Sequence, residues 1–202
     1  MGNSRNVSIL VFDDVEVLDF SGPYEVFNVA SEATTPPPFY VYSVGITDKA
    51  VQGRGKFAFT PRYSIENSPQ ADILIIPGGY GTRPLLKHEG LISWIVEQVG
   101  KVELLVSVCT GALLLAKAGL LKGCPATTHH TAFDRLQELS PTTTIIRDKR
   151  FVQSSANVLT AGGISAGIDV ALHMVNKLAG TKVYTDVVDD DYAALKLTHP
   201  TL

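Results

Sequence analysis

One cysteine in this sequence stands where covalent chemistry is physically favoured. In the segment VSVCTGALLLAKAG a short apolar run ends at Cys109, and an apolar helix is expected from Gly111 onward. A cysteine at such a junction faces unpaired backbone N–H groups and the positive end of the helix dipole, which predicts a lowered thiol pKa and a nucleophilic thiolate. The alternative is an unreactive cysteine buried in the core, a common place for this residue.

An aspartate follows the first apolar run of the chain, residues 7–12. We expect Asp19 to lie in the connection between that strand and a helix that Ser21 or Gly22 caps, with Pro23 in the first turn. The carboxyl ends of parallel strands form the edge at which α/β sheets bind ligands, so Asp19 is a candidate for proton transfer there. It could instead serve only as a turn or capping carboxylate.

Glycines end the apolar run at residues 71–77, in the sequence GGYG. Gly78 and Gly79 could turn backbone amides toward a ligand, as in an oxyanion hole, and are candidate substrate-binding residues. They could equally make only a tight turn before the next helix. The pattern G-x-G-x-x-G of dinucleotide-binding folds does not fit GGYGTR.

Two adjacent histidines, His129 and His130, precede a helix for which Thr131 and Asp134 predict a capping box. Their spacing from Cys124 matches no standard set of metal ligands, so we expect no metal. His129 is instead a candidate substrate-binding residue, hydrogen-bonded near the rim of a pocket.

The order of apolar runs predicts one α/β domain over residues 1–202, with a doubly wound, mostly parallel sheet and helices on both faces. A small edge hairpin is expected within residues 52–61, and a second hairpin from residues 142–146 and 151–154. Strands are also expected at residues 39–46, 103–108 and 158–161.

The composition of the chain limits which binding partners and which cellular compartment we expect. The chain carries a net charge of −3, 45% hydrophobic residues, 18% charged residues and two cysteines. We therefore expect free thiols, a cytoplasmic location and no nucleic-acid partner. We find no signal peptide in the sequence, and no apolar run approaches the roughly 20 residues of a membrane helix. We therefore expect no membrane association. We expect a small molecule as the substrate.

Five segments resemble blocks of the ThiJ/PfpI superfamily nearly end to end: VFDDVEVLDFSGPYEVF, IIPGG, SVCTGALLLAKAGLLKG, ATTHH and LTAGGISAGIDVALHMV. The resemblance implies a flavodoxin-like fold related to class I glutamine amidotransferases, and a homodimer. It also implies that Cys109 is the nucleophile, that Thr110 helps to position substrate, and that Asp19 is the acidic residue beside the thiol.

The blocks look most like those of isonitrile-hydrating members and of the sensor domains of AraC-type regulators. They therefore imply hydration of an isonitrile to a formamide without metal or organic cofactor. Thr110 stands where protease-like members carry histidine, which disfavours a peptidase. Asp19 stands where glyoxalase and deglycase relatives usually carry glutamate, which disfavours those activities; a glyoxal-directed hydratase or deglycase is nevertheless kept as an alternative. A non-catalytic ligand-sensing or stress-response domain is another, although the chain after Leu178 is too short for a helix–turn–helix pair.

Overall fold

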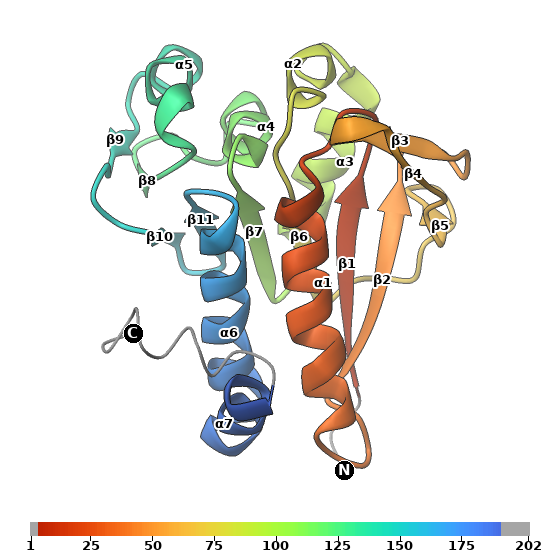
Figure 1. Cartoon of the computed structure of the whole chain (residues 1–202). Coiled ribbons are helices and arrows are strands. Elements are labelled where there is room, and N and C mark those ends of the chain that lie inside the picture. Colours follow the sequence, from red (N-terminus) through yellow and green to blue (C-terminus); the bar gives the residue numbers. More distant parts are fainter. Residues whose placement is uncertain (1–3, 191–202) are drawn as a thin grey trace.

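A seven-stranded sheet runs through the centre of the computed structural model, which describes residues 4–190 (Figure 1). Its strand order is β10-β11-β7-β6-β1-β2-β5, and every neighbouring pair is parallel except β10 with β11. The strands are β1 (Arg5–Val11), β2 (Phe39–Gly45), β5 (Tyr63–Ser64), β6 (Ile73–Ile76), β7 (Leu104–Val108), β10 (Phe151–Ser155) and β11 (Val158–Ala161).

Helices cover both faces of this sheet. The front face in Figure 1 carries three helices that pack on one another, α1 (Val17–Glu32), α6 (Ser165–Ala179) and α7 (Thr181–Asp190). Behind the sheet lie α3 (Glu89–Val99) and α4 (Gly111–Lys117), with α2 (Thr82–Leu85) and α5 (Phe133–Leu139) packed against α4. Every residue of β6 and β7 is buried, as expected for parallel strands covered on both sides. The predicted flavodoxin-like α/β fold is confirmed.

The edge hairpin is also confirmed. Strands β3 (Val51–Gly53) and β4 (Phe57–Phe59) pair antiparallel around a short 3-10 turn, η1 (Arg54–Lys56). The hairpin is joined to the β1–α1 loop by backbone hydrogen bonds from Asp14 N to Gln52 O (2.7 Å) and from Arg54 N to Val15 O (2.8 Å). These bonds bring Arg54 to the carboxyl edge of the sheet.

The start of α1 differs from the expectation. The helix begins at Val17, so Asp19 lies in its first turn and Pro23 lies inside it, without a cap from Ser21 or Gly22. The reason is a β-bridge between Val15 and Gly79, which with the bond from Glu16 N to Gly78 O (2.9 Å) holds the chain extended as far as Glu16. The helix can begin only after that bridge.

The second predicted hairpin is wrong. Residues 144–145 form β9 (Thr144–Ile145), which pairs in parallel with β8 (Pro125–Ala126), whereas β10 pairs with β11. The two residues between Ser155 and Val158 make the turn that brings β10 and β11 together. The predicted capping box is also absent, because a 3-10 turn, η2 (His130–Ala132), precedes α5 and makes Ala132 its N-cap, without a side-chain bond.

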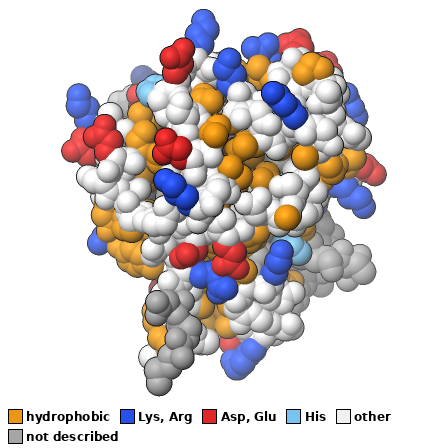
Figure 2. Space-filling view, turned by 180° about the vertical axis from the view of Figure 1, so that it is seen from behind, with side chains coloured by type: hydrophobic (Ala, Val, Ile, Leu, Met, Phe, Trp, Pro, Cys, Tyr) orange, Lys and Arg blue, Asp and Glu red, His pale blue; other side chains and the backbone are white. Residues whose placement is uncertain are grey.

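Seen from behind, apolar side chains are exposed over the upper part and the left flank of the molecule, with charged side chains among and around them (Figure 2). Among residues 4–190, none of the helices combines the length and the apolar character needed to cross a membrane.

Candidate active site

Cys109 occupies a strained turn between β7 and α4. Its φ angle is 56°, in the left-handed region that residues other than glycine seldom adopt. Its N–H donates to Ala161 O (2.9 Å), and its C=O accepts from the Thr128 hydroxyl (2.7 Å). The backbone on both sides of the cysteine is therefore fixed, and the side chain is only 6% exposed.

Two glycines leave the space that the Cys109 side chain fills. A Cβ atom at Gly78 would lie 2.7 Å from the Cys109 Cβ, and one at Gly163 would lie 2.6 Å from that Cβ and 2.9 Å from Sγ. Gly163 also has a φ of 115°, which L-residues with side chains rarely adopt. Gly111 approaches the Ile76 carbonyl oxygen so closely that a Cβ would lie 2.0 Å from it. This strand–Cys109–helix turn, which we call the elbow, therefore depends on glycine at all three positions.

Asp19 lies beside the cysteine and is fully buried. One carboxylate oxygen accepts from the N–H of Ile164 (2.7 Å) and the other from the N–H of Gly78 (3.2 Å). The Cys109 thiol lies close enough to this carboxylate for each group to shift the pKa of the other. Burial raises the pKa of Asp19 from 3.8 to about 6, although the bond from the Ile164 N–H and the nearby Cys109 thiol oppose the rise. The carboxyl group can therefore give up and take back a proton near neutral pH.

The pKa of Cys109 moves in the opposite direction from our expectation. Burial of the thiol, followed by the negative charge of Asp19, raises its pKa above the ordinary value, and the hydrogen bond from the Thr110 N–H only partly opposes this. Helix α4 has only seven residues, and desolvation outweighs the effect of its N-terminus. At neutral pH the pair therefore holds one proton on sulfur, and Asp19 is the nearest base that can accept it.

Thr110 and Gly79 satisfy each other's polar groups. The Thr110 hydroxyl accepts from the Gly79 N–H (2.9 Å), donates toward the Gly79 carbonyl (3.1 Å) and lies 3.3 Å from the Thr82 hydroxyl. The Gly78 N–H is engaged with Asp19. Neither glycine N–H is thus free for an oxyanion in this arrangement. Gly78 supports Asp19 and the elbow, while Gly79 and Thr110 form part of the pocket wall.

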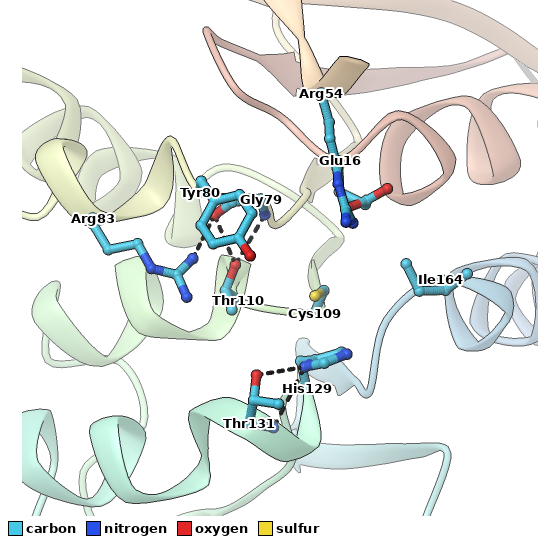
Figure 3. Close-up of a pocket in the computed structure, with 10 residues that line it drawn as sticks. All are labelled: Glu16, Arg54, Gly79, Tyr80, Arg83, Cys109, Thr110, His129, Thr131 and Ile164. Atoms are coloured by element: carbon cyan, nitrogen blue, oxygen red, sulfur yellow. Dashed lines mark hydrogen bonds and ion pairs between the residues drawn. The ribbon is translucent and has the colours of Figure 1, made fainter.

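A cavity of about 100 Å³ opens above the Cys109 thiol (Figure 3). Of the residues proposed from sequence, it brings together Cys109, Thr110, Gly79 and His129, whereas Asp19 and Gly78 are not part of its wall. The other residues of its wall are Glu16, Arg54, Tyr80, Arg83, Thr131 and Ile164. Tyr80 and Arg83 could have been found, because they follow the glycine turn directly in GGYGTR. Nothing in the sequence indicates that Arg54 belongs to the cavity wall, because the edge hairpin places it there only in the folded chain.

His129 lies on the wall near Thr131. Its Nδ1 is 2.9 Å from the Thr131 hydroxyl and accepts from the Thr131 N–H (3.4 Å). Burial, together with the neighbouring His130, lowers the pKa of His129, so the ring is neutral at physiological pH. With Nδ1 as acceptor, the hydrogen of the neutral ring is on Nε2. Within residues 4–190, no group of three or more His, Cys, Asp or Glu side chains could hold a metal ion.

Charged side chains form the mouth of the cavity. Arg54 is paired with Glu16 at 2.6 Å. Arg83 donates to the Gly79 carbonyl oxygen at 2.8 Å, and its guanidinium carbon lies 5.1 Å from the centre of the Tyr80 ring. Arg54 approaches the same ring at 5.9 Å. Tyr80 is 64% exposed, so the two arginines and this ring form the rim through which a ligand would enter.

Known proteins with similar sequences include enzymes and regulators. The chain is 36% identical over 174 residues to an isonitrile hydratase from Pseudomonas putida, an alignment that covers 86% of this chain and 72% of that protein. It is 23% identical over 181 residues to the helix–turn–helix transcriptional regulator GbdR from Pseudomonas aeruginosa, and the match covers 90% of this chain but only 48% of the regulator.

Structural comparison agrees with the sequence. The crystal structure of a THiJ/PfpI family protein from Pseudomonas syringae superposes with a TM-score of 0.82 at 25% identity, over 99% of this chain and 77% of that one. The sequence model of the DJ-1/PfpI family matches residues 5–177, which include both Asp19 and the Cys109 elbow. With this match and the related isonitrile hydratase, the chain belongs to the DJ-1/PfpI family.

Proposed function

We propose that this protein hydrates isonitriles, R–N≡C, to N-substituted formamides, with Cys109 as the nucleophile and Asp19 as the proton carrier. The observation that carries the proposal is the buried Cys109 thiol beside a buried carboxyl group whose pKa is raised to about 6. The terminal carbon of an isonitrile must receive both a nucleophile and a proton, and this pair supplies both. The similarity to an isonitrile hydratase supports the same reaction.

In the first half of the reaction, Asp19 takes the thiol proton as the Cys109 sulfur bonds to the isonitrile carbon. Asp19 then gives that proton to the same carbon. The product is a thioimidate, Cys–S–CH=N–R, in which the isonitrile carbon has gained one sulfur bond and one hydrogen. Asp19 returns to its charged form at this point.

In the second half, Asp19 removes a proton from water as the oxygen bonds to the thioimidate carbon, and it passes that proton to the nitrogen. The resulting adduct, Cys–S–CH(OH)–NH–R, collapses by breaking its C–S bond. The hydroxyl proton returns to the Cys109–Asp19 pair, and the formamide leaves. The two hydrogens of water end on nitrogen and on the pair, so the steps balance without a metal or organic cofactor.

The other wall residues have supporting roles in this proposal. Thr110 fixes the position of Gly79 through its hydroxyl, and Gly78 orients the Asp19 carboxylate. His129 contacts the substrate through the Nε2 hydrogen that its bonding to Thr131 implies. The small cavity suits a small substrate.

A ligand-sensing role is the second candidate, favoured by the similarity to GbdR, of which this chain spans about half the length. A sensor would bind a small molecule in the cavity without turning it over. Binding without product formation is therefore the result that distinguishes it.

The test is turnover of a panel of isonitriles, glyoxals and small amides by the parent protein, Asp19→Asn and Cys109→Ser, with formamide followed by its formyl proton in NMR spectra. We expect isonitrile turnover by the parent and a loss of about 10²- to 10⁴-fold in Asp19→Asn, the usual contribution of a general acid–base. Cys109→Ser should lose at least as much. Turnover of glyoxals but not isonitriles, or unchanged turnover in both variants, would reject the proposal.

A further inference from the structure

We propose that Arg83, held against Tyr80, forms a carboxylate-binding subsite at the cavity mouth, so that the preferred substrates carry a carboxylate close to the reacting carbon. This inference rests on the proposed isonitrile hydration for the identity of the reacting group. The subsite itself rests on charge and geometry, and can be tested without turnover.

Arg83 is a cation of the cavity wall that no carboxylate of the described residues neutralises. The other arginine at the mouth, Arg54, is paired with Glu16 at 2.6 Å. Across residues 4–190, none of the ion pairs includes Arg83. A ligand with a negative charge would therefore meet one uncompensated guanidinium at this rim.

The guanidinium of Arg83 is held in place on two sides. One Nη donates to the Gly79 carbonyl oxygen at 2.8 Å, and the guanidinium carbon lies 5.1 Å from the centre of the Tyr80 ring. An arginine has five N–H donors, so the bond to Gly79 leaves others for a ligand. Its planar fork matches the two oxygens of a carboxylate, and prior placement reduces the entropy lost on binding.

The size of the cavity limits how far the carboxylate can be from the isonitrile. The cavity has a volume of about 100 Å³, and Cys109 and Arg83 both line it. In Figure 3, Arg83 and Tyr80 lie on one side of Cys109 and Ile164 lies on the other. A substrate whose carbon meets Cys109 would extend toward Arg83, which lines the same cavity. Isocyanoacetate is a small isonitrile that carries the required carboxylate.

Two alkylating agents that differ in charge test the subsite at Cys109. Iodoacetate and iodoacetamide have nearly the same size, and each forms an S–C bond as iodide leaves and the thiol proton is lost to base. Alkylation of Cys109 would be followed by peptide mapping, which separates it from Cys124. In Arg83→Gln we expect the ratio of the iodoacetate rate to the iodoacetamide rate to fall about tenfold, as for a charge-assisted bond at an exposed rim.

Arg62→Gln is the matched control. Arg62 also lies over a tyrosine ring, that of Tyr63 at 5.8 Å, but it is not part of the cavity wall. This variant changes the net charge by the same amount and should keep the parent ratio. An unchanged ratio in Arg83→Gln, or an equal fall in Arg62→Gln, would overturn the subsite.

Isocyanoacetate and isocyanoacetamide extend the test to turnover. The ratio of kcat/KM for the acid to that for the amide should fall about tenfold in Arg83→Gln, through KM of the acid. If the parent turns over neither compound, isonitrile hydration is rejected while alkylation still decides the subsite. If it turns over both and the ratio is the same in Arg83→Gln, only the subsite is rejected.

Discussion

Replacing Asp19 by asparagine should change how the stability of the protein depends on pH. The pKa of this carboxyl group is ordinarily 3.8, and burial raises it to about 6 in the fold. The folded state therefore keeps the Asp19 proton over a range in which the unfolded chain has lost it. The contribution of the Asp19 carboxyl group to the free energy of unfolding is fully present below pH 3.8, and it is lost as the pH rises through about 6.

The magnitude follows from the two pKa values. At about 1.36 kcal/mol per pH unit, ionisation of Asp19 removes about 3 kcal/mol of folding free energy in total. About 2 kcal/mol of this falls between pH 4.5 and 7.5. The group is fully buried, so no reduction for solvent screening applies.

Urea unfolding of the parent and Asp19→Asn at several pH values from 4.5 to 7.5 measures this change. The asparagine amide can accept from only one of the N–H groups of Ile164 and Gly78, and the loss of the other bond shifts the stability by the same amount at every pH. The free energy of unfolding of the parent, relative to the variant, should fall by about 2 kcal/mol over this range. A constant difference, or one that rises with pH, would show that the two N–H groups keep Asp19 ionised throughout and would refute its role as a proton donor.

Four further predictions concern the elbow and its assembly. Asp19→Asn should move the midpoint of the pH dependence of iodoacetamide alkylation of Cys109 to lower pH, because the charge that raises the thiol pKa is gone; an unchanged midpoint would contradict the coupling of the two groups. Gly163→Ala should lower turnover about 100-fold by displacing the sulfur, and parent-like kinetics would show that the elbow tolerates a Cβ there. Thr110→Val should cost about 1–3 kcal/mol in thermal or urea unfolding by leaving the Gly79 N–H unpaired, while Thr110→Ser recovers most of it; equal stability of the two variants would count against this bond. Light scattering at micromolar concentration should give a homodimer mass, and a monomer mass would reject the dimer.

The sequence allowed the fold and the position of Cys109 between a strand and a helix to be predicted for a physical reason. Buried parallel strands are continuous apolar runs, so the strand before Cys109 and the helix after it were both recognisable. The place of Asp19 beside the thiol followed from strand order and family resemblance. Its exact position in α1 did not, because the bridge from Val15 to Gly79 joins segments far apart in the chain.

The direction of the pKa shift of Cys109 could not be predicted from the sequence in the same way. A helix N-terminus is visible in sequence, and it predicted a lowered pKa for Cys109. Burial of the sulfur by Gly78 and Gly163 is visible only after folding, and it reverses the direction of the shift. Ile164 was missed for a similar reason, since its N–H reaches Asp19 only because the chain turns at a φ of 53° there.

Trapping the covalent intermediate tests the central claim most directly. An isonitrile is mixed with the protein, the mixture is quenched with borohydride to reduce the C=N bond of the thioimidate, and the peptides are analysed by mass spectrometry. We predict that the peptide containing Cys109, and not the one containing Cys124, gains the mass of the isonitrile plus two hydrogens. Formamide production without any adduct on Cys109, at a rate that Cys109→Ser retains, would contradict the account.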